Sequence, residues 1–367
     1  MFLPFLLSGC WDEKAIENIG FITILGIESS KNGELNLTYG MPVTVTVTVT
    51  DPTTKFYSEI LDTTSSLLRI GRDKLRLQSS KTLEAGKIQY MVFSKEIAEK
   101  VPIGSINEVF ERDPSNPVLA WVAVVDCSPR ELIHTSVKYI DKPRPSIYIT
   151  HLMERAAECG YTPETRVYNF NIINFAPGID NITPLIAFDS KAVEVKGSAL
   201  FSSGKMVGTI NPRQTGLLIS MMKTLKNKRY TYIASDLTED TTTPKKGLAI
   251  LLRQNSKKIY ISIQDNNPKV DIYLNLYGYI DEYKWDNLRD KNRVKQLSSL
   301  VQQQIQEDCQ KLIEYMQSIE SDPIGIGDMV RAKYNSYFKG VVWHNEYKKA
   351  IITTHVKFNI IQYGDIQ

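Results

Sequence analysis

The sequence predicts an α+β protein with more than one domain, built from mostly antiparallel or mixed sheets, packed helices and one long helix near residues 290–320. Three observations predict this class. Several stretches alternate apolar and polar residues, a helix-period apolar stripe follows residue 290, and 367 residues exceed the usual size of a single core. Hydrophobic residues make up 42% of the chain and charged residues 23%, as in ordinary folded proteins.

The first ten residues have the form of a lipoprotein signal. An apolar run over 2–7 leads into Ser8, Gly9 and Cys10, and the Cys10 thiol is the group that would receive a diacylglyceryl chain after cleavage. Residues 1–9 are then a truncated signal peptide, because they lack a basic segment and full length, and we expect a start codon further upstream. Two acyl chains, at roughly 0.8 kcal/mol per buried methylene, anchor a protein stably. The alternative is a chance small-small-Cys triplet in a cytosolic protein.

Charge and cysteine content exclude several classes of protein. The net charge of +3 comes from 44 basic and 41 acidic residues spread along the chain, so nucleic acid is not an expected partner. If Cys10 carries lipid, Cys127, Cys159 and Cys309 can form at most one disulfide. None of these three has the spacing of a metal or redox motif, so we expect buried inert thiols.

The N-terminal region, residues 10–190, begins with a predicted hairpin. An apolar strand over 21–28 precedes an Asn-Gly turn, and a second strand over 35–49 has apolar residues at its odd positions. Pro42 cannot donate to a ladder, so the second strand should lie at an edge or break there. The Thr-Val repeat at its end indicates a solvent-facing threonine row, with a partner-pairing edge as the alternative.

A helix is predicted over 62–77, with Asp62 or Thr63 as its cap. The apolar run over 118–125 is the best candidate for a central strand buried on both faces. The other elements predicted before residue 190 are a strand over 87–93, short helices over 94–100 and 105–112, a proline-rich connector over 141–145 that allows a break between two subdomains, a helix over 149–159, and a surface segment over 174–184.

The C-terminal domain, residues 191–367, should combine an antiparallel sheet with the long helix. A hairpin over 193–210 leads to a helix capped by Asn211, and alternating strands over 259–263 and 270–276 form a meander. From Asp290 onward apolar residues recur every three or four positions. They are Val294, Leu297, Val301, Ile305, Cys309, Leu312, Met316 and Ile319. The closing strand carries its apolar face at Val356, Phe358 and Ile360.

The sequence contains no phosphate loop, nucleophile elbow or zinc-protease spacing, so no catalytic residue, metal ligand or cofactor is expected. Gly325 and Gly327 could approach an anion, but a loop into a helix capped by Asp328 is the favoured interpretation. His151 and Glu154 have ligand-like spacing on a predicted helix, but two ligands do not make a site and an exposed helical pair is the favoured interpretation.

Several short motifs occur in a characteristic order over nearly the whole chain. They are Gly9-Cys10-Trp11-Asp12-Glu13 with Gly26-Ile27, then Phe93-Ser94-Lys95-Glu96-Ile97-Ala98 with Glu111-Arg112-Asp113, then Gly197-Ser198-Ala199-Leu200-Phe201 with Val207-Gly208, and Asp322-Pro323-Ile324-Gly325-Ile326-Gly327 with Trp343 and Gly364. In this order they resemble the Ger(x)C family, the lipoprotein C subunits of nutrient germinant receptors in bacterial spores.

The resemblance implies a non-enzymatic subunit on the outer face of the spore inner membrane, held there by a diacylglyceryl group on Cys10. It also implies assembly with polytopic A and B receptor subunits. The alternative is a lipid-anchored solute-binding protein of an importer, which needs two lobes of repeated βα units around a cleft. A cell-envelope hydrolase would need a catalytic constellation, and the sequence contains no sign of one.

Overall fold

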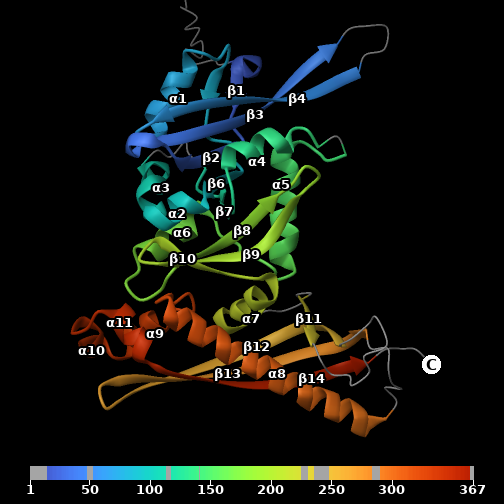
Figure 1. The fold of residues 1–367 in the computed structure, drawn as a ribbon, viewed down its shortest axis with the longest axis vertical. Helices are drawn as coiled ribbons and strands as arrows, with labels where there is room; N and C mark the ends of the chain where they lie inside the picture. The colour runs from blue at the N-terminus through green and yellow to red at the C-terminus, as the bar shows by residue number, and fades with distance from the viewer. Residues whose placement is uncertain are drawn as a thin grey trace, which may run out of the picture.

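The computed structural model describes residues 15–47, 53–112, 117–139, 141–224, 230–234, 248–282 and 290–363. Over these ranges the chain forms an eight-stranded sheet, a four-stranded sheet and a small parallel pair. Figure 1 shows the eight-stranded sheet and its helices in the upper part of the molecule and the four-stranded sheet below it. The predicted α+β class with mixed sheets is confirmed.

The eight-stranded sheet has the order β10-β9-β8-β7-β6-β2-β3-β4. Its four central strands β8, β7, β6 and β2 run parallel, whereas the pairs on both flanks are antiparallel. The predicted central strand forms β7, and all five of its residues are buried. The strands are β2 Ile24–Ser29, β3 Leu35–Val47, β4 Thr53–Ser65, β6 Tyr90–Ser94, β7 Trp121–Val125, β8 Ile182–Phe188, β9 Val193–Ser202 and β10 Lys205–Ile210.

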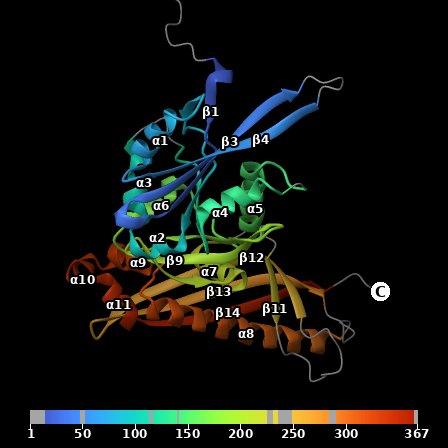
Figure 2. The ribbon, with the colours of Figure 1, turned by 45° about the horizontal axis from the view of Figure 1, so that its top comes forward.

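Helices cover both faces of this sheet because its central strands are apolar on both sides. Along β6, Met91 and Phe93 belong to one core cluster, whereas Tyr90 and Val92 belong to another. Figure 2 shows the two helix layers on opposite sides of the sheet. One layer contains α1 Leu68–Arg76, α2 Lys95–Lys100, α3 Ile103–Arg112 and α6 Val167–Asn174, and the other contains α4 Pro129–Ser136 and α5 Pro145–Glu158.

The chain enters this layered unit through short elements. The 3-10 helix η1, Ile16–Asn18, leads into β1, Ile19–Phe21, which pairs in parallel with β5, Thr82–Glu84. The predicted Asn-Gly turn forms η2, Lys31–Gly33, where Asn32 and Gly33 both have positive φ.

The four-stranded sheet has the order β11-β12-β13-β14, and α7 and the predicted long helix α8 pack with its apolar face in one core. The apolar positions of the long helix are buried from Val294 to Met316 and Ile319 packs against the same core, so this prediction is confirmed. The elements are α7 Pro212–Met222, β11 Tyr230–Ala234, β12 Leu248–Gln264, β13 Asn267–Glu282, α8 Lys291–Ser318, α9 Ile326–Lys333, α10 Asn335–Lys339, α11 Trp343–Lys349 and β14 Ile351–Tyr363. No helix in the described part of the chain has the length and apolarity that crossing a membrane requires.

Three local predictions are wrong. Asp62 and Thr63 do not cap a helix, because β4 continues to Ser65 and pairs there with β3. The predicted surface segment over 174–184 is wrong for its second half, since Asp180 is buried and β8 begins at Ile182, whereas Phe175 in the first half is 69% exposed. The C-terminal sheet is not wholly antiparallel, because β14 runs parallel to β13.

Pro42 lies inside β3, but beyond Gly40, where the pairing of β3 with β2 ends. Because Pro42 shares its hydrogen-bonding side with Gly40, its missing N–H faces the open side of the ladder. The predicted edge position is therefore confirmed locally, although β3 lies between two strands along its first half.

The predicted domain limits remain predictions, but hydrogen bonds run across two of them. Strands β7 and β8 flank the 141–145 connector and are neighbours in one sheet. Strands β9 and β10 follow residue 191 and complete that same sheet. The connector is thus part of a crossover within the eight-stranded sheet.

Candidate functional site

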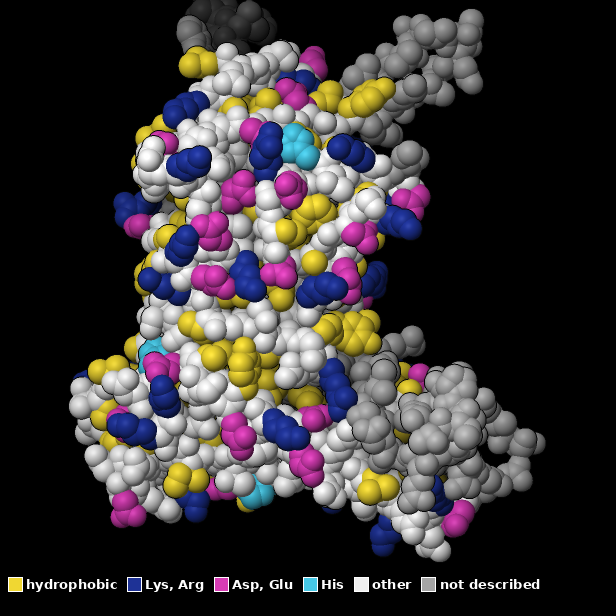
Figure 3. All heavy atoms as spheres, in the orientation of Figure 1, with side chains coloured by type: hydrophobic (Ala, Val, Ile, Leu, Met, Phe, Trp, Pro, Cys, Tyr) yellow, Lys and Arg dark blue, Asp and Glu magenta, His cyan; other side chains and the backbone are white. Residues whose placement is uncertain are grey.

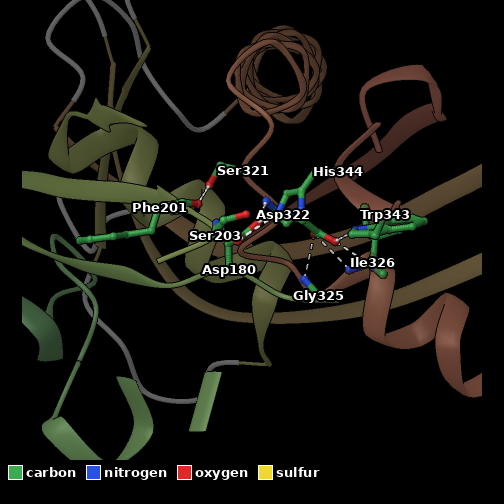
Figure 4. Close-up of polar contacts among 10 residues, drawn as sticks. Asp180, Phe201, Ser203, Ser321, Asp322, Gly325, Ile326, Trp343 and His344 are labelled. Carbon is green, nitrogen blue, oxygen red and sulfur yellow. Dashed lines mark hydrogen bonds and ion pairs between the residues drawn. The ribbon is translucent and has the colours of Figure 1, made fainter. Parts of the chain in front are cut away.

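Two aspartates are buried beside each other where the eight-stranded sheet meets the C-terminal helices, as Figure 4 shows. Asp180 precedes β8 and is 7% exposed, whereas Asp322 follows α8 and is fully buried. Trp343 and His344, at the start of α11, complete a group that we call the buried carboxylate cluster. A buried carboxylate is stable only when hydrogen-bond donors or cations surround it, so the partners of these two aspartates show what the cluster does.

The Asp322 carboxylate is surrounded by N–H donors from the loop that follows it. Its Oδ1 accepts from the backbone N of Gly325 at 3.0 Å and of Ile326 at 3.1 Å. Its Oδ2 accepts from the backbone N of Gly327 at 2.8 Å and from Trp343 Nε1 at 3.0 Å. The loop does approach an anion, and that anion is the chain's own side chain.

This arrangement corrects the predicted helix cap. The loop turns the chain into α9 as predicted, but Asp322 bonds the first N–H groups of that helix. Asp328 lies at the exposed surface and pairs with Arg331. Gly325 takes a left-handed backbone with φ 75°, which allows the chain to wrap around the carboxylate.

Asp180 connects this loop to the eight-stranded sheet and to α11. Its Oδ2 accepts from the backbone N of Asp322 at 2.9 Å, and its Oδ1 accepts from the backbone N of Ser203 at 3.1 Å. His344 Nε2 lies 3.2 Å from Oδ1 and 3.1 Å from Oδ2. Ser321 Oγ also donates to the carbonyl of Phe201 at 2.6 Å. Segments more than 100 residues apart are therefore joined at one point.

Burial sets the acidity of this cluster. Desolvation of the carboxylate raises the pKa of Asp322 to about 6, because it outweighs the hydrogen bonds that Asp322 accepts. The hydrogen bond that the His344 imidazole donates to the Asp180 carboxylate raises the pKa of His344 above its usual 6.5, against the opposing effect of desolvation.

The contacts of the cluster indicate a structural joint. All four hydrogen-bonding positions of the Asp322 carboxylate are filled by N–H donors of the protein. Across the described ranges, no group of three His, Cys, Asp or Glu residues is arranged to hold a metal ion. His151 and Glu154 on α5 therefore belong to no such group. The arrangement holds α9–α11 against β8–β10 and presents no free nucleophile.

The other predicted site residues are the cysteines. Cys10 lies outside the described residues. Cys309 is buried, as predicted, and its burial raises its pKa to about 12. The prediction of a buried thiol is wrong for Cys127, which is exposed, and Cys159 is half-buried. The three thiols are free, so no disulfide forms among them.

Sequence reasoning missed Asp180 and His344. Asp180 stands in a stretch rich in Pro, Gly and Asn that suggested a surface segment, and nothing local relates it to a histidine 164 positions later. The only available signal was the Asp-Pro-x-Gly-x-Gly sequence after the long helix, in which one acidic residue precedes two glycines.

A second feature is an apolar surface on α6. Tyr168, Ile172 and Phe175 follow each other at helical spacing and are 46%, 67% and 69% exposed, beside Val118 and Leu119. The opposite face of α6 is also apolar and buries Val167 and Phe170. Apolar side chains therefore lie on both the buried and the exposed face of α6, and an exposed apolar patch of this kind is typical of a surface that a partner covers.

Comparison with known proteins gives matches over almost the whole chain. Residues 12–188 match the family described as spore germination protein N-terminal domain, and residues 196–364 match spore germination B3/GerAC like, C-terminal. The chain is 24% identical to the spore germination protein GerQC of Bacillus cereus over 98% of this chain and 94% of that protein.

The fold has a counterpart among solved structures. The crystal structure of the GerBC protein matches 92% of this chain and 97% of its own, with a TM-score of 0.59 and 13% sequence identity. With both halves of the sequence matched in order and the fold shared, the chain belongs to the Ger(x)C family of spore germination proteins.

Proposed function

We propose that this protein is the lipid-anchored, non-catalytic C subunit of a nutrient germinant receptor, and that it acts on the outer face of the spore inner membrane. The observation that carries the proposal is the pair of spore germination family matches, which together extend from residue 12 to residue 364. The subunit would assemble with polytopic A and B subunits and help to trigger germination.

Two features of the surface and interior support this role. The buried carboxylate cluster uses its charged groups to join segments of the chain, which suits a scaffold. The apolar α6 surface, with Ile172 and Phe175 largely exposed, suits a protein that is covered by partners when assembled.

A solute-binding protein would need two similar lobes around a cleft. In the described part of the chain the two main sheets differ in strand number and in order, one having eight strands and the other four. This difference favours the receptor subunit.

The anchor is tested by Cys10→Ala, which removes the only thiol in the predicted cleavage box. We expect the variant to lose lipid labelling, to leave the membrane fraction and to weaken the response to nutrients, because acyl chains supply the membrane affinity. Cys127→Ala is the matched control, since it removes an exposed thiol elsewhere. Unchanged fractionation and labelling of the Cys10 variant would disprove anchoring.

The assembly is tested by co-purification of the tagged chain from spore membranes in mild detergent. We expect two multi-span membrane proteins to copurify in fixed proportion to the chain. Recovery of importer permease and ATPase subunits in their place would favour the solute-binding protein.

A further inference from the structure

Helix α1 presents an apolar and basic stripe to solvent. Its inner face buries Leu68, Gly71 and Leu75 against the eight-stranded sheet. The outward side chains include Leu67, Ile70 and Leu77, which are 60%, 43% and 90% exposed, with Lys74 between them at helical spacing. We call the stripe formed by Leu67, Ile70, Lys74 and Leu77 the α1 face.

The segment that carries this face is strongly basic. Residues 66–81 contain five basic side chains and one acidic one, a net charge of +4, although the whole chain has a net charge of only +3. The acidic residue, Asp73, pairs with Arg76, and the Lys74 ammonium donates to the backbone oxygen of Thr64. The basic side chains are Arg69, Arg72, Lys74, Arg76 and Lys81.

The α1 face lies at the end of the molecule where the chain enters the fold. β1, near the start of the fold, pairs with β5, the strand that follows α1 in the chain. Gly20 of β1 and Lys81 are therefore close together, and a Cβ added at Gly20 would lie 3.3 Å from the Cβ of Lys81. Ile16, at the start of η1, is 74% exposed. Figures 1 and 3 show α1 at this upper end, with Lys and Arg side chains among apolar ones on the visible face.

The short stretch of chain between Cys10 and Ile16 limits the distance between a lipid on Cys10 and the end of the molecule where the chain enters the fold. Cys10 precedes Ile16 by six positions, and six residues span at most about 20 Å in any conformation. If Cys10 carries lipid, as the proposed function requires, the entry end of the molecule is held close to a bilayer.

We propose that the α1 face lies on the surface of an anionic lipid bilayer. Leucine and isoleucine side chains enter the boundary between headgroups and acyl chains, and the surrounding arginines and lysines attract the anionic headgroups. The acyl chains retain the protein at the membrane, and α1 sets its orientation there, so that the four-stranded sheet points away from the lipid.

The test uses the full chain carrying Cys10→Ala, so that binding is measured without the acyl anchor. Vesicles of phosphatidylglycerol and phosphatidylcholine in equal parts are compared with vesicles of phosphatidylcholine alone by co-sedimentation over a range of salt concentrations. We expect preferential binding to the anionic vesicles, weakening as salt is added.

In this background, Lys74→Glu with Arg76→Glu should weaken binding by at least roughly 30-fold, because each basic residue near the surface contributes about 1 kcal/mol. Lys258→Glu with Lys357→Glu is the matched control, since it makes the same charge change at exposed positions of the four-stranded sheet. Ile70→Ser with Leu77→Ser should also weaken binding but leave the salt dependence largely unchanged. Thermal unfolding confirms that each variant folds.

Equal binding to both vesicle types, or equal loss in the two charge-reversal pairs, would overturn the proposal. So would a Lys74/Arg76 pair that keeps vesicle binding but loses co-purification with membrane subunits, because a protein partner would then occupy the face. Failure of lipid labelling at Cys10 contradicts the anchor alone, whereas these outcomes contradict the α1 contact alone.

Discussion

Asp322 illustrates how a single buried charge can organise a loop, a helix start and a domain contact together. Its four N–H partners come from three successive residues at the start of α9, Gly325 to Gly327, and from Trp343 on a separate helix. A buried carboxylate whose hydrogen-bonding positions are all filled favours the native path of the chain chiefly because any other path would leave the buried charge unpaired. The residue therefore specifies the path of the chain at this point.

We expect Asp322→Asn to lower the free energy of unfolding by about 3 kcal/mol, because the new amide NH2 would face backbone or indole donors where an acceptor is needed. Denaturant unfolding monitored by tryptophan fluorescence measures the change. Asp328→Asn, at an exposed carboxylate in the first turn of α9, should shift stability by less than about 0.5 kcal/mol. Equal effects of the two substitutions would contradict the role of Asp322.

The same cluster predicts that stability falls as pH rises from 5 to 8. The folded pKa of Asp322, about 6, exceeds its ordinary 3.8, so its protonation contributes stability that is complete below 3.8 and lost as pH rises through about 6. The pKa of His344 is also raised, by Asp180, so its contribution is complete below 6.5 and lost as pH rises through its folded value.

Denaturant unfolding at several pH values checks this prediction. His344→Gln should reduce the loss of stability above pH 6.5, because the variant has no imidazolium to lose. A wild-type profile that rises between pH 5 and 8 would show that other groups dominate.

At the scale of elements, α8 protects the edge of β14. Gln302, Gln306 and Gln310 recur every four positions, and their Oε1 atoms accept from the backbone N of Phe358, Val356 and Thr354 at 3.1, 3.2 and 3.1 Å. Gln310 Nε2 also donates to the carbonyl of Ile352 at 3.0 Å. The glutamines occupy N–H groups that another strand would otherwise pair with.

Replacing Gln302, Gln306 and Gln310 together by alanine should lower the free energy of unfolding by about 3 kcal/mol, roughly 1 kcal/mol for each glutamine. The exposed edge should also promote self-association, which sedimentation velocity detects. Gln303→Ala, at an exposed position where the side chain donates to Glu307, is the control. A triple variant that stays monomeric and as stable as wild type would contradict this role.

The local sequence predicted an element correctly where its apolar period matches the face that is buried. It failed where pairing with a distant strand overrides the local preference for helix. The long helix was predictable because its apolar stripe repeats over seven turns or so and is buried as a unit. The segment around Asp62 has helix-start residues, but β3 supplies strand partners, and Thr38 Oγ1 donates to Asp62 Oδ1 at 2.7 Å. No window of local sequence contains that partner.

At the scale of the molecule, the two sheets are connected by a shared core and by the buried carboxylate cluster. Ile182, Leu200 and Ile210 of the eight-stranded sheet belong to the same apolar cluster as the four-stranded sheet, α7 and α8. The backbone oxygen of Gly178 accepts from the N of Asp328 at 2.8 Å next to the cluster. The two parts should therefore unfold together.

Gly178→Ala tests this connection, because an added Cβ would lie 2.4 Å from both the N of Asp328 and the carbonyl carbon of Gly327. We expect a fall of at least about 2 kcal/mol in the free energy of unfolding. At Gly340 an added Cβ would meet its nearest atom at an ordinary 3.5 Å, so Gly340→Ala should be close to neutral. If calorimetry of Gly178→Ala shows two separate unfolding transitions, with that of the eight-stranded sheet unchanged, the two parts unfold independently.

The sequence by itself determined the family, the α+β class, the buried central strand and the long helix, because each rests on ordered motifs or on a local period. Tertiary structure alone decided that β9 and β10 join the first sheet, that β14 runs parallel to β13, and that Asp180 meets Asp322 and His344. These features depend on contacts between distant segments, whose free energy comes from shared burial and leaves no periodic trace along the chain.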